Sequence, residues 1–195
     1  MTTRVKHWPV PGSFSRRIPP GSSTGSFWKW RGDRHHCGVD LFAPAGTPVL
    51  AVEAGRVIRR GVFTSPAKKP YWNRTFFVLI RHDSGVVAKY AELGKILGRN
   101  GQRGAAGRPV GAVGRVLNSK HVDKTAPSYI RQMVRKARVS MLHFELYSAP
   151  AKETNSYSGG NWFAGRKPAH LLDPADYLQS AVHPNRRFSS ARVPR

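Results

Sequence analysis

Short apolar runs that alternate with polar residues, separated by turn residues, dominate positions 36–93. Alternation with a period of two is typical of β-strands that bury one face. The runs predict strands over 36–42, 48–54, 55–61, 75–81 and 86–90. Asp83 and Gly85, in the loop between the last two runs, are typical of a tight hairpin turn. This pattern predicts a mainly β, antiparallel domain.

The second half of the chain adds one helical segment to this β pattern. Residues 94–114 are rich in glycine, which suits tight turns between short strands. Over 126–138, apolar residues recur at helical spacing while basic residues occupy the other face. A further strand is expected over 140–148, and residues 171–178 close the domain. We therefore expect one short basic helix inserted into a β domain.

The chain of 195 residues is long enough for one domain with its own core and with extensions. Residues 1–26, rich in Pro, Gly, Ser and Arg, predict an extended basic arm. The domain is expected over residues 27–180, with an insertion at about 115–139. An Arg-rich tail over residues 181–195 completes the chain.

The charge balance is strongly basic, with 33 Lys and Arg against 10 Asp and Glu and a formal net charge of +23. Such an excess concentrates a protein on polyanions. It favours nucleic acid, anionic wall polymers or acidic membrane surfaces as partners. A basic surface that is merely solvated is the alternative.

Cys37 is the only cysteine of the chain, which excludes an intramolecular disulfide and a cysteine-based zinc cage. Alternation along a strand points Cys37 away from the face that His36 and Asp40 share, so we expect a buried free thiol. Met1–Val10 lacks the apolar core of a secretory signal peptide. If the target lies outside the cytoplasm, where the protein is made, lysis, a virion or a secretion device must deliver it.

Three side chains form a candidate metal-binding set. His36 and Asp40 lie four residues apart, and His143 lies in the apolar run Leu142–Leu146. Imidazole and carboxylate are ligands that zinc accepts, and three protein ligands leave a fourth position open, as in catalytic sites. Each residue alone has an ordinary structural explanation, such as a core histidine or a turn aspartate. Together they predict a zinc site.

The spaced motif His36-x-Gly38-x-Asp40, which continues through residue 57, resembles the signature of the lysostaphin-type, LytM-like zinc metallopeptidases. Further matching pieces follow in the family's order: the hairpin at 78–85, Tyr90-Ala-Glu-Leu93, the glycine run at 107–114, Leu142-His143-Phe144-Glu145 and Leu-Asp-Pro-x-x-Tyr-Leu at 172–178. The resemblance covers roughly residues 31–178.

The resemblance implies a compact antiparallel β-sheet domain of the duplicated-hybrid-motif type. It also implies an enzyme that cleaves peptide cross-links in bacterial cell-wall peptidoglycan with water activated by Zn²⁺. Carried over residue by residue, it makes His36, Asp40 and His143 the zinc ligands.

The chain departs from the family pattern at two positions. Family enzymes carry histidines in a Tyr-x-His-Leu motif and at the start of a His-x-His motif, which position or deprotonate the attacking water and stabilise charge on the intermediate. Here those positions are Glu92 and Met141. In one interpretation Glu92 acts as the general base, and His121 or an arginine of the insertion donates to the oxyanion. In the other, Glu92 is a fourth ligand or a hydrogen-bond acceptor beside the metal, and the site is structural.

Aromatic side chains are candidates for substrate contacts. Trp72, which has basic neighbours, is predicted to bind substrate. The same role is predicted for Tyr90, in the family motif, and for Tyr147, which alternates onto the face of His143. The other loop aromatics are expected in the core: Trp28, Trp30, Tyr71 and Trp162.

Two functions of different classes follow. The first is a zinc metalloendopeptidase directed at peptidoglycan. The alternative is a catalytically inactive, metal-stabilised structural or binding protein inside a large polyanionic assembly, such as a virion or a nucleoprotein particle. The two replaced histidines and the net charge of +23 motivate this alternative.

Overall fold

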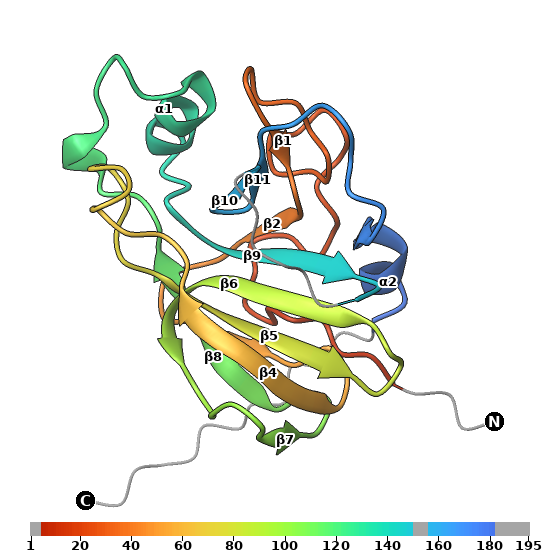
Figure 1. Ribbon diagram of the computed structural model, residues 1–195. Helices are drawn as coiled ribbons and strands as arrows, with labels where there is room; N and C mark the ends of the chain where they lie inside the picture. Colours follow the sequence, from red (N-terminus) through yellow and green to blue (C-terminus); the bar gives the residue numbers. More distant parts are fainter. Residues whose placement is uncertain (1–4, 150–155, 182–195) are drawn as a thin grey trace, which may run out of the picture.

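A computed structural model of the chain describes residues 5–149 and 156–181 (Figure 1). The strands of these segments are β1 (His35–His36), β2 (Val39–Phe42), β3 (Pro48–Leu50), β4 (Gly55–Val62), β5 (Phe76–His82), β6 (Val87–Ile96), β7 (Arg103–Gly104), β8 (Pro109–Arg115), β9 (Ser140–Tyr147), β10 (Tyr157–Ser158), β11 (Asn161–Trp162) and β12 (Leu171–Leu172). The helices are α1 (Ser128–Arg135), α2 (Ala175–Gln179) and a 3-10 turn, Ser119–His121. No helix of the described part is both long and apolar enough to cross a membrane.

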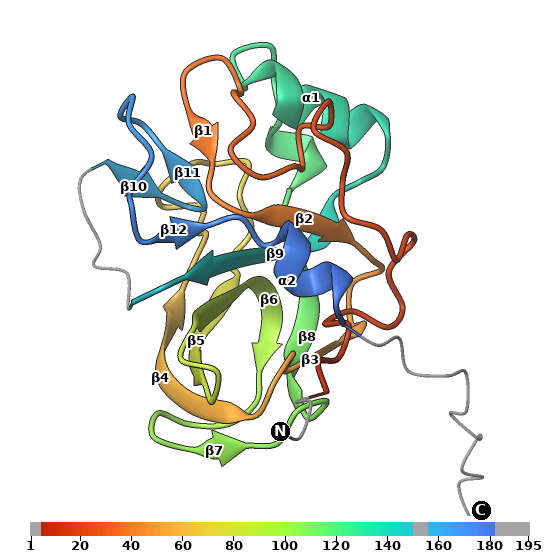
Figure 2. The ribbon, with the colours of Figure 1, turned by 90° about the vertical axis from the view of Figure 1, so that its right-hand side faces the viewer.

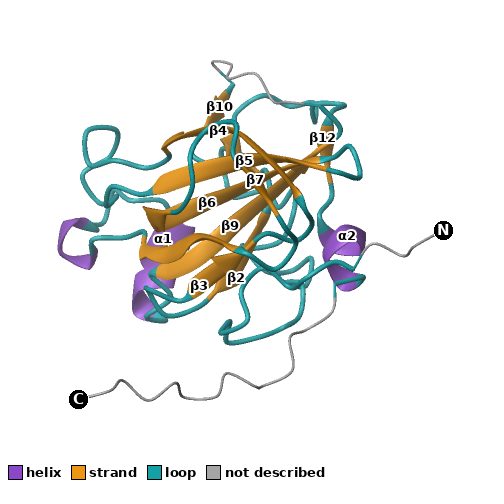
Figure 3. Cartoon of the chain, turned by 90° about the horizontal axis from the view of Figure 1, so that it is seen from below, coloured by secondary structure: helices purple, strands orange, loops and turns teal. Residues whose placement is uncertain are grey.

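Nine of these strands form one antiparallel sheet, in the order β12-β9-β8-β6-β5-β4-β7, with β2 beside β9 and β3 beside β8. Figure 3 shows these strands lying side by side, with α1 and α2 at opposite ends of the molecule. A second sheet of three short strands, β1-β11-β10, stands above one end of β9 together with α1 (Figure 1). The prediction of a mainly β antiparallel domain with one inserted helix is confirmed.

Strand β9 is the element that positions the site, because it pairs with β2 on one side and with β6 on the other. In this register Asp40 lies directly opposite His143, and Ala91 lies opposite His143 from the other strand. Side chains of directly opposed residues share one face of a sheet. The register therefore brings residues that are about a hundred positions apart in sequence into contact.

Both faces of the central strands are buried, which explains the continuous apolar run of β5. Val78 and Ile80 belong to the main core, whereas Phe77 and Leu79 pack in a second cluster on the opposite face. Figure 2 shows α2 against the sheet near β9, where Leu178 enters the main core.

The segment before residue 27 forms little regular structure but is not detached from the domain. Trp8 and Val10 are fully buried in the main core. The described part of the predicted arm therefore packs on the sheet, while the predicted tail lies almost entirely outside the described residues.

Several expected elements are shorter in the structure. The helix expected over 126–138 spans only Ser128–Arg135, because Pro127 precedes it and Ala137 has a φ of 53°. The strand expected over 36–42 is interrupted between β1 and β2. Cys37, in this interruption, is a buried free thiol as predicted, and burial raises the pKa of the thiol.

Gly38 explains why the interruption occurs. A Cβ added to Gly38 would lie 2.2 Å from the carbonyl oxygen of Phe144, closer than any real contact. Only a glycine lets the backbone approach β9 here, and this approach sets the path of the chain from His36 to Asp40.

We expect Gly38→Ala to lower the free energy of unfolding by about 3 kcal/mol, because backbone must move to relieve the overlap. The measurement is urea unfolding of both proteins. Gly104→Ala, where a Cβ meets nothing within 4 Å, is the matched control and should change stability little. Equal stabilities of the two variants would contradict this account of the β2–β9 approach.

Candidate metal centre

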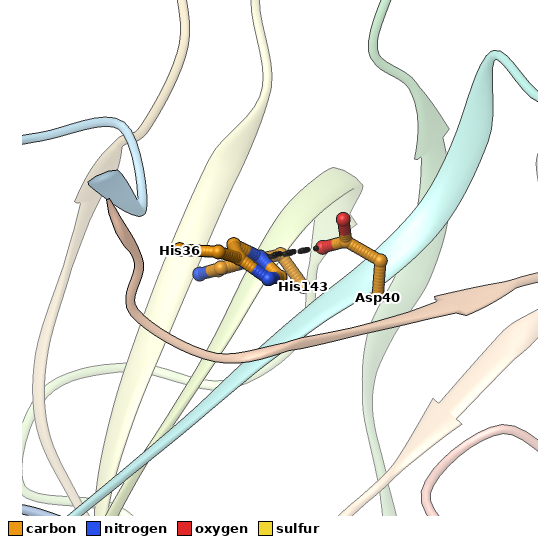
Figure 4. A group of neighbouring side chains, drawn as sticks. All are labelled: His36, Asp40 and His143. Atoms are coloured by element: carbon orange, nitrogen blue, oxygen red, sulfur yellow. Dashed lines mark hydrogen bonds and ion pairs between the residues drawn. The ribbon is translucent and has the colours of Figure 1, made fainter. Parts of the chain in front are cut away.

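His36, Asp40 and His143 meet on one side of β9, as the sequence predicts (Figure 4). His36 Nε2 lies 2.9 Å from His143 Nδ1 and 3.1 Å from Asp40 Oδ1. His143 Nδ1 lies 3.0 Å from the same carboxylate oxygen. All three side chains are buried. Three potential metal-ligand atoms, two imidazole nitrogens and one carboxylate oxygen, therefore lie within bonding reach of a single ion.

This triangle of donor atoms fits a zinc ion. Bonds of about 2.0–2.1 Å in a tetrahedral site separate neighbouring ligand atoms by roughly 3.3 Å, close to the distances found here. The tautomers fit as well, because His36 Nδ1–H donates to the Ser26 carbonyl at 2.8 Å and leaves Nε2 as the ligand atom. His143 Nε2–H donates to Glu145 at 2.7 Å and leaves Nδ1 as the ligand atom.

Glu145 is the centre of a buried network behind His143. Its carboxylate forms an ion pair with Lys89 at 2.9 Å and accepts hydrogen bonds from the hydroxyls of Tyr147 and Tyr157. Burial opposes the ionised carboxylate, but the charge of Lys89 and the hydrogen bond from His143 outweigh burial and lower the pKa of Glu145. An ionised carboxylate that holds a metal-ligating histidine fixes the ring and makes it a stronger ligand.

The two histidines differ in protonation. Burial, together with the charge of Arg31, lowers the pKa of His36 to about 4. Burial also opposes the charged form of His143, but hydrogen bonds to Asp40 and Glu145 outweigh it and raise its pKa to about 9. At neutral pH and without metal, His36 is neutral and His143 is an imidazolium.

Glu92 reaches the same cavity through an irregularity in β6. Strand β6 carries a β-bulge here, because two of its residues, Ala91 and Glu92, lie opposite the single residue Phe77 of β5. Glu92 has a φ of 63° at this bulge. Burial, and next the charge of Asp40, raise the pKa of the Glu92 carboxyl to about 8. Its Oε2 atom is buried without a hydrogen-bond partner among the described residues.

Arg31 is a charged residue of the site that the sequence analysis misses. Its Nη2 donates to Asp40 Oδ2 at 2.8 Å, the carboxylate oxygen that does not face the histidines. Thr24 and Asn161 hold the rest of the guanidinium, which lies over the ring of Tyr129. The side chain is only 6% exposed. Its position five residues before His36, in a loop, carries no sequence signal of this role.

The cavity that Asp40, His143, Glu92 and Arg31 share has a volume of only about 20 Å³, room for about one water molecule. Its roof consists of Trp72, one face of α1, the segment that follows β8 and the start of β9: Tyr129, Ile130, Met133, Val116, Leu117 and Met141. The metal site is therefore closed on the side of the insertion.

Some of the residues predicted to act in catalysis or substrate binding lie at the metal cavity, and others do not. Trp72 lines the metal cavity, and Tyr147 contacts Glu145 beside it. His121 is not brought to the metal cavity: its Nδ1–H donates to the Pro70 carbonyl at 3.1 Å, and it lines a separate cavity with Arg31.

The prediction that Tyr90 binds substrate is contradicted by its position. Tyr90 is fully buried in the main core, opposite Phe144, where its hydroxyl accepts a hydrogen bond from Val52 N at 2.8 Å and contacts His82. A regular strand would place residues 90 and 92 on the same face. The bulge separates them, so that only Glu92 faces the metal site.

Other residues of the site are also absent from the sequence analysis. The ring of Phe63 stacks on that of His143 with centroids 5.5 Å apart. Gly160 lies against the same imidazole, since a Cβ there would be 2.6 Å from His143 Nε2. The Gly159-Gly160 pair is a sequence signal for a close backbone approach, although it does not reveal what is approached.

We expect Glu145→Gln to weaken zinc binding about 10–100-fold, because a neutral amide holds His143 less firmly in its ligand orientation. Competition with a chromophoric chelator measures the affinity. Asp123→Asn removes an exposed carboxylate outside the metal cavity and serves as the control. Wild-type affinity in Glu145→Gln would show that the network behind His143 does not support metal binding.

We also expect zinc affinity to rise with pH, by about tenfold per unit, up to a pH near 9. The metal must displace the Nδ1 proton of His143, whose pKa is raised to about 9. His36 does not compete with protons in this range, because its pKa is lowered to about 4. Chelator competition at pH 6, 7 and 8 tests this slope, and a flat profile would contradict the protonation state assigned to His143.

Comparison with known proteins agrees with this geometry. Residues 34–155 match the family model described as peptidase family M23. The chain is 32% identical over 107 residues to the uncharacterized lipoprotein YgeR of Escherichia coli (strain K12). This match covers 55% of the chain and 36% of that protein, so the chain spans about a third of its relative's length.

Solved structures also match the chain, and that of LytU shows the same fold. The structure of LytU is 22% identical and covers 88% of both chains with a TM-score of 0.50. The catalytic domain of the antimicrobial peptidase lysostaphin from Staphylococcus simulans is 20% identical and covers 90% of this chain and 92% of that one, with a TM-score of 0.45. The match over residues 34–155, which include all three candidate metal ligands, shows that the chain belongs to peptidase family M23.

Proposed function

We propose that this protein is a zinc metallopeptidase that hydrolyses peptide bonds in bacterial cell-wall peptidoglycan, with Glu92 as the general base. The observation that carries the proposal is the position of the Glu92 carboxylate. It shares one small cavity with the Asp40 and His143 side chains and has an oxygen without a partner among the described residues. In the resemblance to the Tyr-x-His-Leu motif, Glu92 stands where family enzymes have a histidine, which supports the same role.

His36, Asp40 and His143 would hold the zinc ion, which acts as a Lewis acid that polarises a peptide carbonyl and lowers the pKa of water. Glu92 would accept the proton from the attacking water and return it to the leaving amine. The pKa of about 8 applies without metal. A cation beside the carboxylate lowers that pKa toward the range in which Glu92 is an ionised base at neutral pH.

Arg31 would supply the positive charge that a second histidine supplies in the family pattern. Its four hydrogen bonds to described residues occupy both N–H groups of Nη2, the single one of Nε and one of Nη1. Arginine carries five such donors. One N–H of Nη1 therefore has no acceptor among the described residues and would donate to the carbonyl oxygen of a bound peptide, whose negative charge grows during attack.

The charge of the chain supports a wall target, because a net charge of +23 attracts the protein to anionic wall polymers. The sequence match to a protein named as a lipoprotein agrees with a role beyond the cytoplasm. Lysis, a virion or a secretion device would deliver the protein to the wall.

A second function is favoured by one observation, the volume of about 20 Å³ around the metal site. This volume holds no peptide, so substrate entry requires that α1 or Trp72 move. In a catalytically inactive protein the same closed cavity would make the metal a structural element. The protein would then act as a binding module inside a polyanionic assembly.

The zinc-loaded protein should release muropeptides from purified peptidoglycan, and Glu92→Gln should lower this rate at least about 100-fold. The amide keeps the size of Glu92 but cannot take a proton. Mass spectrometry of the released fragments measures the rate, and one bound zinc per chain is checked in both proteins. His121→Ala is the control and should retain the wild-type rate, because His121 lies outside the metal cavity.

Two results would contradict the proposal. Undiminished cleavage by Glu92→Gln would remove Glu92 from the mechanism. No cleavage by the wild-type protein, with one zinc bound per chain, would favour the structural metal site.

A further inference from the structure

Three arginines lie side by side on neighbouring strands, at the end of the sheet that carries β7, away from α1 (Figure 1). In the β4–β5 register Arg56 lies directly opposite Arg81, and in the β4–β7 register Arg56 lies directly opposite Arg103. Directly opposed residues share one face of a sheet, and neighbouring strands lie about 4.8 Å apart, so the three residues span roughly 10 Å. All three are exposed. We call this set the arginine row.

The arginine row carries more positive charge than its surroundings neutralise. Arg103 forms an ion pair with Asp83 at 2.5 Å, and no other carboxylate of the described residues forms an ion pair with the row. Arg56 donates from Nη1 to the Gly101 carbonyl at 2.6 Å, a neutral acceptor that fixes the guanidinium without neutralising it. The side chain of Arg81 has no hydrogen bond or ion pair with a described residue. Two positive charges therefore stand uncompensated on opposed positions.

Like charges that face each other across two strands destabilise a sheet. A negatively charged partner that lies across the strands removes this repulsion. The guanidinium group has five N–H donors in a planar fork, which suits bidentate binding of phosphate. Arg56 uses one of these donors on Gly101, and Arg81 uses none on a described residue. The arginine row is therefore suited to a chain of phosphate groups.

The arginine row lies on the same face of the sheet as the candidate metal site. Val87 of β6 pairs with Arg81 on one side and with Tyr147 on the other. Tyr147 and His143 are four residues apart on β9, so their side chains point to the same face. Four residues along a strand and two steps between strands place the backbones of Arg81 and His143 roughly 15–20 Å apart. A polymer bound to the arginine row is therefore held on the side of the metal site.

The surroundings of the arginine row favour a polymer without bases. Surfaces that bind single-stranded nucleic acid combine basic side chains with exposed aromatic rings on which the bases stack. The exposed aromatic side chains of the described residues are Phe14, Trp30 and Phe163, and none of them belongs to β4, β5 or β7. The arginine row thus offers contacts to phosphate alone.

We propose that the arginine row binds a polyol-phosphate wall polymer, a chain of phosphodiesters that carries no bases. The inference rests on the proposed function for the location of the target. It adds an anchoring surface that holds the protein on the wall polymer with the metal site on the same side. Arg56 and Arg81 make the phosphate contacts, and the ion pair with Asp83 limits the contribution of Arg103.

The test is isothermal titration of the zinc-loaded full chain with poly(glycerol phosphate) at several salt concentrations. Arg56→Gln/Arg81→Gln should weaken binding about tenfold at low salt and lower the slope of log K against log salt by about one or more, because phosphate contacts are lost. Asp83→Asn should instead tighten binding about threefold or more, because it frees the charge of Arg103.

A matched double variant removes the same charge elsewhere. Arg131 and Arg135 are exposed residues of α1, which lies away from the arginine row (Figure 1). Arg131→Gln/Arg135→Gln should bind the polymer within about twofold of the wild type and with the same salt slope, although its net charge equals that of the test variant. Thermal unfolding of each variant checks that it is folded.

Equal losses in the two double variants would overturn the proposal, because binding would then follow net charge alone. Single-stranded oligothymidylate that carries the same number of phosphates and binds more than about tenfold more tightly than poly(glycerol phosphate) would also overturn it, in favour of nucleic acid.

The titration does not require hydrolysis, so its failure is distinguishable from failure of the proposed function. A selective loss in Arg56→Gln/Arg81→Gln, without any cleavage of peptidoglycan by the wild type, would support the anchoring surface and contradict the hydrolase. Cleavage of peptidoglycan by the wild type, together with equal losses in the two double variants, would do the reverse.

Discussion

The register between β2 and β9 is the constraint on which the site depends. It sets Asp40 opposite His143, and the close approach at Gly38 holds His36 beside them. Because side chains alternate between the two faces of a sheet, a slip of one residue would turn Asp40 away from His143. The candidate metal site is therefore a consequence of strand pairing, and the apolar residues that fix this pairing position His36, Asp40 and His143 without belonging to the site.

Charge balance is the second constraint, because the site buries several ionisable groups at once. Arg31 compensates Asp40 on the oxygen that faces away from the histidines, and Lys89 compensates Glu145 behind His143. Paired charges of this kind are tolerated in a protein interior, whereas an isolated one is costly. Glu92 has no such partner among the described residues, and burial, followed by the charge of Asp40, raises its pKa to about 8. A buried carboxyl with a perturbed pKa beside a metal site is typical of a catalytic group.

Much of this arrangement could be predicted from the sequence, because strand alternation and motif spacing are local properties. They gave the antiparallel β domain, the inserted helix, the buried thiol of Cys37 and the three residues that converge in the candidate metal site. The bulge at Glu92 could not be predicted, since it depends on how β6 pairs with its neighbours. The substrate-binding role predicted for Tyr90 rested on the family motif, whereas the structure buries Tyr90 in the main core. Arg31 was missed because only the folded loops bring it to Asp40.

The central claim is that three side chains hold the metal while Glu92 stays uncoordinated and able to accept a proton. A crystal structure of the zinc-loaded protein, with the ion located by its anomalous scattering, tests this claim most directly. The account predicts one ion bonded to His36 Nε2, Asp40 Oδ1 and His143 Nδ1, with both oxygens of Glu92 beyond bonding distance. A zinc ion bonded directly to Glu92 as a fourth protein ligand would contradict it, because the site would then be closed and structural.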